Sequence, residues 1–74
     1  MAFRLGECLL LNVLKRRNMS QSEFARRMNV SRQYIHRLAT NQKVMSLEFA
    51  INACYVLDCD ILDLYVIETT GRQE

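Results

Sequence analysis

Three side chains that can each make a pair of directed hydrogen bonds stand close together in the 74-residue sequence: Arg32, Gln33 and Arg37. Arginine can donate to both O6 and N7 of guanine, and glutamine can donate to N7 and accept from N6 of adenine. In a helix of about 3.6 residues per turn these three side chains share one side, and Ile35 and Leu38 occupy the other. The spacing therefore predicts a helix that reads base edges in the DNA major groove.

The residues before this helix predict the element that positions it. In the stretch "MSQSEFARRMNVSRQYIHRL", Ser20 and Ser31 each stand where a helix could be N-capped. Ser20 and Glu23 have the spacing of a capping box, in which the hydroxyl accepts from the Glu23 backbone N–H and the carboxylate reaches back. Asn29 tolerates a left-handed conformation and should end the first of the two helices. Two helices joined so tightly must cross steeply, which predicts a helix-turn-helix at about 20–39.

Basic residues gather around this predicted motif. The formal net charge is only +2, but eight of the ten Lys and Arg residues fall between Lys15 and Lys43, where Glu23 is the single acid. Such asymmetry favours a polyanionic partner, although solvated helix faces give the same pattern. Gln21, at the open N-terminus of the second helix, is placed to help hold a DNA phosphate. The cations expected to contact phosphates are Arg16, Arg17, Arg26, Arg27 and Lys43.

The composition predicts one all-α domain spanning 1–74. Half of the residues are hydrophobic, there is no proline, and there are only two glycines. A chain of this length has room for a single core. Five helices account for the pattern, and the first is expected from about Leu5 to Arg17, where apolar residues recur at helical spacing.

The second half of the chain supplies the last two expected helices. Ser46 should cap a fourth helix that runs to Leu57, and Asp60 should cap a short fifth helix. From Val66 onward we expect a tail. The residues expected to face the core are Leu47, Ala50, Ile51, Cys54 and Leu57 in the fourth helix and Ile61, Leu64 and Tyr65 in the fifth.

Several classes of protein have no support in the sequence. Three cysteines at irregular spacing, Cys8, Cys54 and Cys59, predict neither a disulfide framework nor a zinc site, and favour the reducing cytoplasm. No nucleophile has a recognisable base, and no glycine-rich phosphate loop is present, so we expect neither catalysis nor a cofactor. No apolar run approaches the ~20 residues of a membrane span.

The stretch quoted above resembles the Cro/repressor-type helix-turn-helix of the xenobiotic-response-element family. The later stretch "SLEFAINACYVLDCDILDLY" is similar to the fourth and fifth helices of that family. Two departures are Asn29 and Asn41, which stand where glycine is usual. The positions that match the helix-turn-helix pattern are Met19, Ser20, Gln21, Phe24, Ala25, Val30, Ser31 and Ile35.

This resemblance implies a five-helix, phage-repressor-like fold that binds operator DNA as a dimer and regulates transcription. It implies base contacts from Arg32, Gln33 and Arg37. It also implies DNA backbone contacts from Gln21 at the start of the second helix and from Ser31 and Tyr34 at the start of the third. In the loop "LATNQK" the expected phosphate contact passes to Thr40, Asn41 or Lys43.

Two further expectations concern protein partners. The basic surface must meet DNA, so a homodimer is expected to form through the region of the fourth and fifth helices around Asp58 to Tyr65, with Val66 and Ile67 of the tail as apolar contacts. The alternative function is a protein-interaction module, such as an antitoxin-like subunit, that keeps the fold but acts mainly through a partner protein. The apolar first helix, in which Leu11 and Leu14 stand where relatives often carry Arg, supports that alternative.

Overall fold

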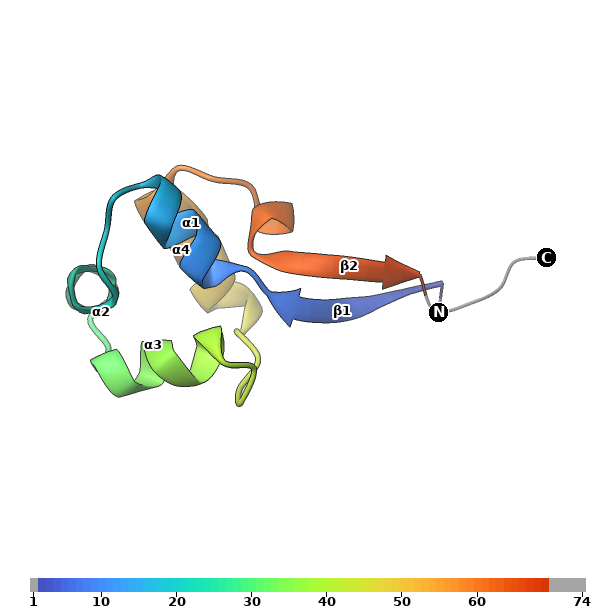
Figure 1. Ribbon diagram of the computed structural model, residues 1–74, viewed down its shortest axis with the longest axis horizontal. Coiled ribbons are helices and arrows are strands. Elements are labelled where there is room, and N and C mark those ends of the chain that lie inside the picture. Colours follow the sequence, from blue (N-terminus) through green and yellow to red (C-terminus); the bar gives the residue numbers. More distant parts are fainter. Residues whose placement is uncertain (1, 70–74) are drawn as a thin grey trace.

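The computed structural model describes residues 2–69, and in these the helices form a body from which two strands project (Figure 1). In chain order the elements are β1 (Phe3–Cys8), α1 (Leu10–Arg16), α2 (Gln21–Met28), α3 (Arg32–Ala39), α4 (Leu47–Leu57), the single 3-10 turn η1 (Ile61–Asp63) and β2 (Tyr65–Thr69). The strands near the two ends of the chain therefore lie side by side. The residues after 69, which include part of the expected tail, lie outside the described residues.

The prediction of an all-α, five-helix domain is wrong. β1 and β2 form an antiparallel sheet in which Phe3 pairs with Thr69 and Leu5 with Ile67. The first helix begins at Leu10 rather than at Leu5, the expected fifth helix is only the turn η1, and the expected tail from Val66 is part of β2. The reason is that each strand is specified by a partner at the other end of the chain, which local helical periodicity does not detect.

The predicted starts of the second, third and fourth helices and the predicted left-handed conformation of Asn29 are confirmed. Ser20, Ser31 and Ser46 each accept a hydrogen bond from the backbone N–H three residues on, at 3.0 to 3.1 Å. Asn29 and Asn41 have φ angles of 60° and 65°. One half of the capping box does not form, because the Glu23 carboxylate accepts from Arg26 and Arg27 instead of from the Ser20 backbone.

The core lies where α1, α2, α3 and α4 meet. Each side chain fully buried there contributes roughly 1.5–3 kcal/mol relative to an exposed one. The largest fully buried side chains are Phe24, Leu10, Ile35, Leu38, Leu57, Leu64 and Val13. They come from all four helices and from the residue that follows η1, so the core fixes α3 relative to the rest of the body.

The predicted inner face of α4 is partly wrong. Ala50 and Leu57 are buried as expected, and Ala53 is fully buried as well. Leu47 and Ile51 are instead 70% and 47% exposed. In η1, Ile61 is 44% exposed, whereas the expected burial of Leu64 and Tyr65 is confirmed. The inner face of α4 is narrow because the small Ala50 and Ala53 allow close packing, and this leaves Leu47 and Ile51 on the outside.

Three hydrogen bonds hold the strands, and the residues directly next to them, against the helical body. The Leu9 backbone N–H donates to the Leu64 carbonyl at 2.7 Å, and the Tyr65 hydroxyl accepts from the Met45 backbone N–H at 3.1 Å. Burial raises the pKa of the Tyr65 phenol above its ordinary value. The third contact joins Asn41 to the Cys8 backbone N–H. The end of the sheet nearest the helices is therefore firmly placed.

Gly6 allows the two strands to approach on the polar side of the sheet. A Cβ at this position would lie 2.9 Å from the Val66 carbonyl oxygen and 2.9 Å from a carboxylate oxygen of Glu68. Glu68 accepts a hydrogen bond from Arg4 Nε at 2.9 Å across the sheet. The missing side chain thus gives Glu68 the room to lie over β1 and reach Arg4.

Candidate nucleic-acid interface

The outer side of α3 is polar, exposed and rigidly supported. Ser31 caps the helix, and Ile35 and Leu38 are both fully buried beneath it. Arg32, Gln33 and Arg37 are all exposed. Within residues 2–69, none of these three side chains makes a hydrogen bond or an ion pair. The predicted base-reading residues therefore share one free surface on a fixed helix.

Four side chains from two helices surround a shallow hollow of about 510 Å³ beside this surface. Gln21 comes from the first turn of α2, Arg32 and Gln33 from the first turn of α3, and His36 from the next turn. Arg37 does not line the hollow. The structure thus brings Gln21 next to two of the three predicted base readers, as a shared DNA contact requires.

His36 belongs to this surface but was not among the predicted contacts. It follows Arg32 by four residues and Gln33 by three, and side chains at those spacings are neighbours on a helix. It is exposed and lines the hollow with Gln21. The helical spacing in the sequence already places His36 on the same side as Arg32, Gln33 and Arg37, although no DNA contact was predicted for it.

Tyr34 lies at the edge of α3, between the core and a cation. Its ring packs edge-on against Phe49, with centroids 5.6 Å apart, and Phe49 in turn meets Phe24 at 6.3 Å. Lys43 Nζ lies 5.9 Å from the centre of the Tyr34 ring. A cation near an aromatic ring is held by the ring's negative face. Tyr34 thus places Lys43 beside the exposed surface of α3.

The loop between α3 and α4 is held by its own side chains. The Thr40 hydroxyl donates to the His36 carbonyl at 2.8 Å and accepts from Gln42 Nε2 at 2.8 Å. The Asn41 side-chain oxygen accepts from the Cys8 N–H at 2.9 Å. Two of the three candidates for the loop phosphate contact therefore already have partners, and Lys43 is the one with a free ammonium group within the described residues.

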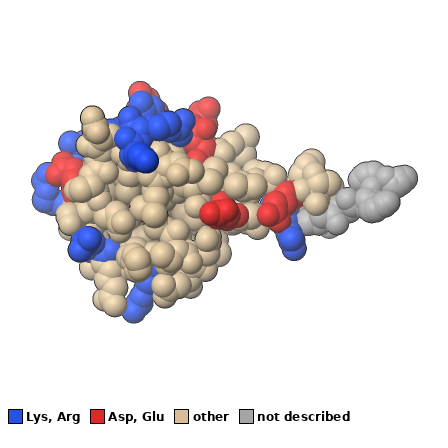
Figure 2. Space-filling model, viewed as in Figure 1, with Lys and Arg blue, Asp and Glu red and all other residues tan. Residues whose placement is uncertain are grey.

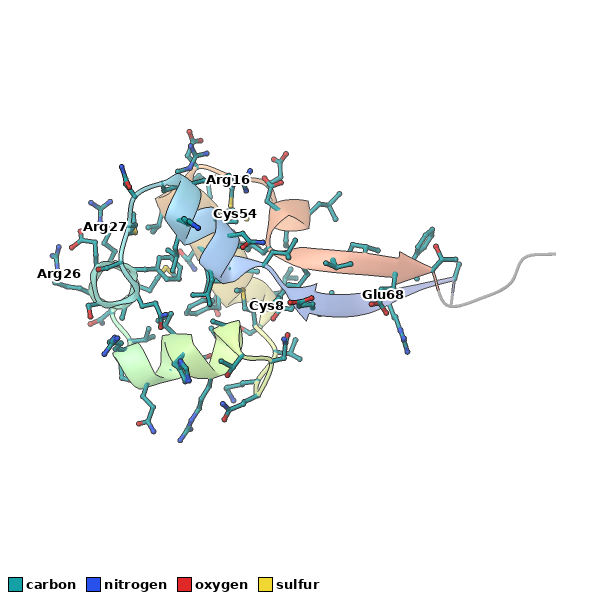
Figure 3. All side chains as sticks on the ribbon, viewed as in Figure 1. Cys8, Arg16, Arg26, Arg27, Cys54 and Glu68 are labelled. Carbon is teal, nitrogen blue, oxygen red and sulfur yellow. The ribbon has the colours of Figure 1, made fainter. Side chains whose placement is uncertain are left out.

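Arg26 and Arg27 project from α2 at one end of the molecule (Figure 3). Both donate to Glu23, Arg27 at 2.8 Å. These hydrogen bonds, first from Arg27 and then from Arg26, lower the pKa of the Glu23 carboxyl below its ordinary value. All three side chains are exposed enough for water to weaken the pairs. The two arginines therefore remain free to exchange Glu23 for another anion.

Arg17 is used within the fold. Its Nε donates to the Leu57 carbonyl at 2.7 Å, and its Nη2 donates to the Asp58 carbonyl at 2.6 Å. These are the end and the cap of α4, where carbonyls lack helical partners and a positive charge is favoured. Arg16, its neighbour, lies at the end of α1 away from α3 (Figure 3). The structure thus gives Arg17 a stabilising contact in addition to its predicted phosphate contact.

The charges are unevenly distributed over the surface. In the view of Figure 2, Lys and Arg atoms appear mainly around the helical body, including its lower edge at α3. On the projecting strands the same view shows acidic groups beside a single basic group. The basic segment predicted from the sequence thus lies on the helical body, around α1, α2 and α3.

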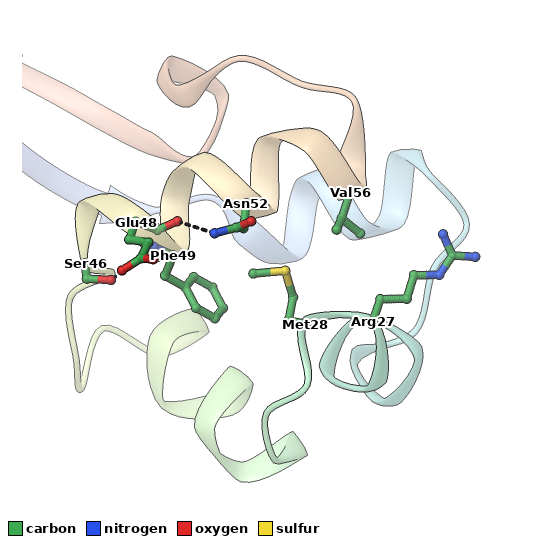
Figure 4. Close-up of a pocket in the computed structure, with 7 residues that line it drawn as sticks. All are labelled: Arg27, Met28, Ser46, Glu48, Phe49, Asn52 and Val56. Carbon is green, nitrogen blue, oxygen red and sulfur yellow. Dashed lines mark hydrogen bonds between the residues drawn. The ribbon is translucent and has the colours of Figure 1, made fainter.

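A second hollow, of about 420 Å³, lies between α2 and α4 (Figure 4). Phe49 and Met28 contribute apolar surface, and Asn52 Nδ2 donates to the Glu48 carbonyl at 2.9 Å. The Ser46 hydroxyl caps α4, and the single histidine of the chain lies elsewhere, in α3.

Residues 2–69 hold no group of three or more His, Cys, Asp or Glu side chains that could bind a metal ion. In the same range, no helix combines the length and the apolar character needed to cross a membrane.

Known proteins provide an independent comparison. The family model of the Cro/C1-type HTH DNA-binding domain matches residues 10–70. A comparison with curated proteins gives no match. Among solved structures, the chain is similar to the crystal structure of the transcriptional regulator VanUg, Form II, with a TM-score of 0.70 and 23% identity over 95% of this chain and 92% of that one. Because the family model covers most of the sequence, including α2 and α3, the chain belongs to the family of Cro/C1-type helix-turn-helix DNA-binding domains.

Proposed function

We propose that this DNA-binding domain is a sequence-specific transcriptional regulator that reads its site with α3. The observation that carries the proposal is the outer surface of α3, where Arg32, Gln33 and Arg37 are exposed on a helix fixed by buried Ile35 and Leu38. Arginine and glutamine side chains match the major-groove edges of guanine and adenine. A rigid helix limits the entropy lost when these side chains bind. No catalytic group is needed for this role, and we propose none.

The DNA backbone contacts are assigned to residues that surround this surface. Gln21 lies in the first turn of α2, where backbone N–H groups and the helix dipole favour a phosphate. Tyr34 and Lys43 lie on the other side of α3, and Arg26 and Arg27 extend the positive surface along α2. Ser31 and Arg17 contribute mainly by fixing helices, since their side chains bond to Tyr34 N and to the end of α4.

The regulator is further proposed to be a small, cytoplasmic repressor of the phage or prophage type, within the xenobiotic-response-element group. One recognition helix contacts only a few base pairs, which is too little to select a site in a genome. Two copies on an inverted repeat, with α3 helices ~34 Å apart, would square that discrimination. Occupying a promoter would then block transcription without any ligand or cofactor.

Selection of bound fragments from random DNA, followed by sequencing, tests the proposal. We expect an enriched inverted repeat. Arg32→Ala, Gln33→Ala and Arg37→Ala should each lose ~1–3 kcal/mol of specific binding and relax the selected sequence at one position per half-site. Their circular dichroism should stay native. Enrichment of no sequence, or three variants that bind the selected site as tightly as the wild type, would remove α3 as the reader.

The alternative function has weaker support in the fold. A protein partner bound through the first helix would need several exposed apolar residues there. Of the two leucines that motivated it, Leu14 is 3% exposed and only Leu11, at 44%, reaches the surface. The apolar character of α1 is therefore largely explained by the core.

A further inference from the structure

An apolar groove of about 350 Å³ lies where α4, η1 and the sheet meet. Its surface comes from Leu47 and Ala50 of α4, Ile61 and Leu62 of η1, and Leu5 and Ile67 of the sheet. Among the described residues, no charged side chain lines it. We call these six residues the apolar groove.

The groove is bordered by large apolar side chains that stand out into solvent. Leu47 is 70% exposed and Leu62 is 67% exposed, although both belong to residue types that are usually buried. Phe3, at 60%, and Ile51, at 47%, extend the same kind of surface beyond the groove. Soluble monomers rarely expose a contiguous apolar surface of this kind without using it.

The sheet has the same one-sided character. Phe3, Leu5 and Ile67 share one face, because residues paired directly across strands point to the same side. The opposite face carries the ion pair between Arg4 and Glu68, which satisfies its polar groups within the chain. An isolated two-stranded sheet is marginally stable in water unless something packs on it. The charged groups of the polar face are thus paired within the chain, whereas no part of residues 2–69 packs over the apolar face.

We propose that a second copy of this chain binds at the apolar groove, about a two-fold axis. The proposal deepens the proposed function, on which it rests for the need of a dimer on DNA. In such an interface the same surface serves both partners, so it must contain both protrusions and a hollow. Leu47 and Leu62 are the protrusions, and the 350 Å³ groove between α4 and the sheet is the hollow.

The exposed apolar area around the groove is close to the area that each partner contributes to a standard protein–protein interface. Seven residues, the five exposed ones of the groove together with Phe3 and Ile51, are each 44% to 70% exposed. Taking roughly 200 Å² for each large apolar residue, they expose on the order of 750 Å², near the ~800 Å² that each partner contributes to a standard interface. The groove has no charged side chains that could pair with a charged partner. A second copy of the same uncharged surface can bind there without such pairing.

The groove leaves the DNA-reading surface free. It shares no residue with the hollow formed by Gln21, Arg32, Gln33 and His36. In Figure 1, η1 lies above β2 and α3 lies at the lower edge of the helical body. Of the three interface residues predicted from the sequence, Ile67 lies in the groove and Tyr65 lines it, while Val66 alternates onto the opposite face of β2. The sequence prediction already covered residues 58–65, which contain η1, and the inference adds Leu47 and Ala50 of α4 and Leu5 of β1.

Analytical ultracentrifugation of the full chain without DNA, over a wide concentration range, tests the inference. We expect a monomer–dimer equilibrium in the wild type. Leu47→Asp together with Leu62→Asp should weaken the dimer by roughly 100-fold or more, since buried anchors dominate interface energies. Leu11→Asp is the matched control, because Leu11 is an equally apolar residue on α1 with 44% exposure. It should dimerise like the wild type.

A gentler pair, Leu47→Asn with Leu62→Asn, guards against misfolding of the charged variant. Circular dichroism should be native, and dissociation should again be promoted. A wild type that stays monomeric at all concentrations, or a dimer weakened by Leu11→Asp and untouched by both groove variants, overturns the inference. Failure of the proposed function looks different: the groove-dependent dimer would form, but no DNA sequence would be selected. Selection of a single half-site by a monomer would instead contradict the inference but support sequence-specific DNA binding.

Discussion

The side-chain oxygen of Asn41 accepts a hydrogen bond from the backbone N–H of Cys8 at 2.9 Å. This contact joins the loop after α3 to the last residue of β1, thirty-three positions earlier in the chain. It also provides a hydrogen-bond partner for a partly buried backbone N–H at the end of β1, just before α1 begins. Asn41 thus has two roles, since its own backbone is left-handed, with φ at 65°.

Replacing Asn41 by glycine should therefore destabilise the protein, although glycine adopts the same φ more easily. The Cys8 N–H would lose its partner, at a cost of ~1–3 kcal/mol. Asn29→Gly is the matched control: Asn29 has a similar φ of 60°, and no side-chain hydrogen bond of Asn29 is found within residues 2–69. Urea denaturation should show a loss of stability for Asn41→Gly alone. Equal stabilities of the two variants would show that the Asn41–Cys8 contact contributes nothing.

The helix-turn-helix could be predicted because its signals are local. Ser20, Ser31 and Asn29 determine where α2 and α3 begin and end through contacts within a few residues. The outer surface of α3 followed from helical spacing alone. The same local reasoning located Ser46 at the start of α4.

The sheet could not be predicted in this way. Leu5 pairs with Ile67, and neither strand has a local signal that names the other. The prediction of which α4 residues are buried was partly wrong for a related reason. Leu47 and Ile51 stand at the helical spacing typical of core residues, but Ala50 and Ala53 occupy the interior. Arg17 was predicted from charge, whereas its carbonyl partners at the end of α4 depend on how the helices pack.

Arg17 and Arg16 should separate stability from charge. Arg17→Ala removes two hydrogen bonds to carbonyls at the end of α4, and bonds from charged donors contribute roughly 1.5–3 kcal/mol when partly buried. Because the hydrogen bond to the Asp58 carbonyl is exposed, we expect a loss of stability near the lower end of this range. Arg16→Ala removes the same charge without a hydrogen-bond partner within the described residues. The thermal unfolding midpoint should fall for Arg17→Ala and stay near the wild-type value for Arg16→Ala; equal midpoints would contradict the assignment.

Cys59 should react slowly with thiol reagents while the protein is folded. Burial, followed by the neighbouring Cys54 thiol, raises the pKa of Cys59 to about 11 from 9.0. At pH 8 its thiolate fraction is then roughly 100-fold below that of an unfolded chain. Because the folded pKa is raised, its contribution to stability is present below about pH 9 and is lost as the pH rises through about 11. Mass spectrometry of iodoacetamide labelling should show slow modification at Cys59 and faster modification in urea. Equal rates in both states would contradict this.

Glu23→Gln should strengthen non-specific DNA binding. Glutamine keeps the shape of the side chain and the Ser20 cap, which uses the residue 23 backbone N–H at 3.0 Å. It removes the carboxylate that Arg26 and Arg27 now share, so both become free for phosphates. The slope of log affinity against log salt concentration should steepen by up to about one unit for each new phosphate contact, whereas Glu48→Gln, at the exposed start of α4, should change nothing.

The effect of Glu23→Gln should also depend on pH. In the wild type the pKa of Glu23 is lowered, so its pairing with Arg26 and Arg27 is fully present above the ordinary pKa of 4.5 and is lost as the pH falls through the lowered pKa. The affinity difference between wild type and Glu23→Gln should accordingly shrink in acid and be full at pH 7. An unchanged affinity and salt slope at pH 7 would show that Arg26 and Arg27 do not face DNA.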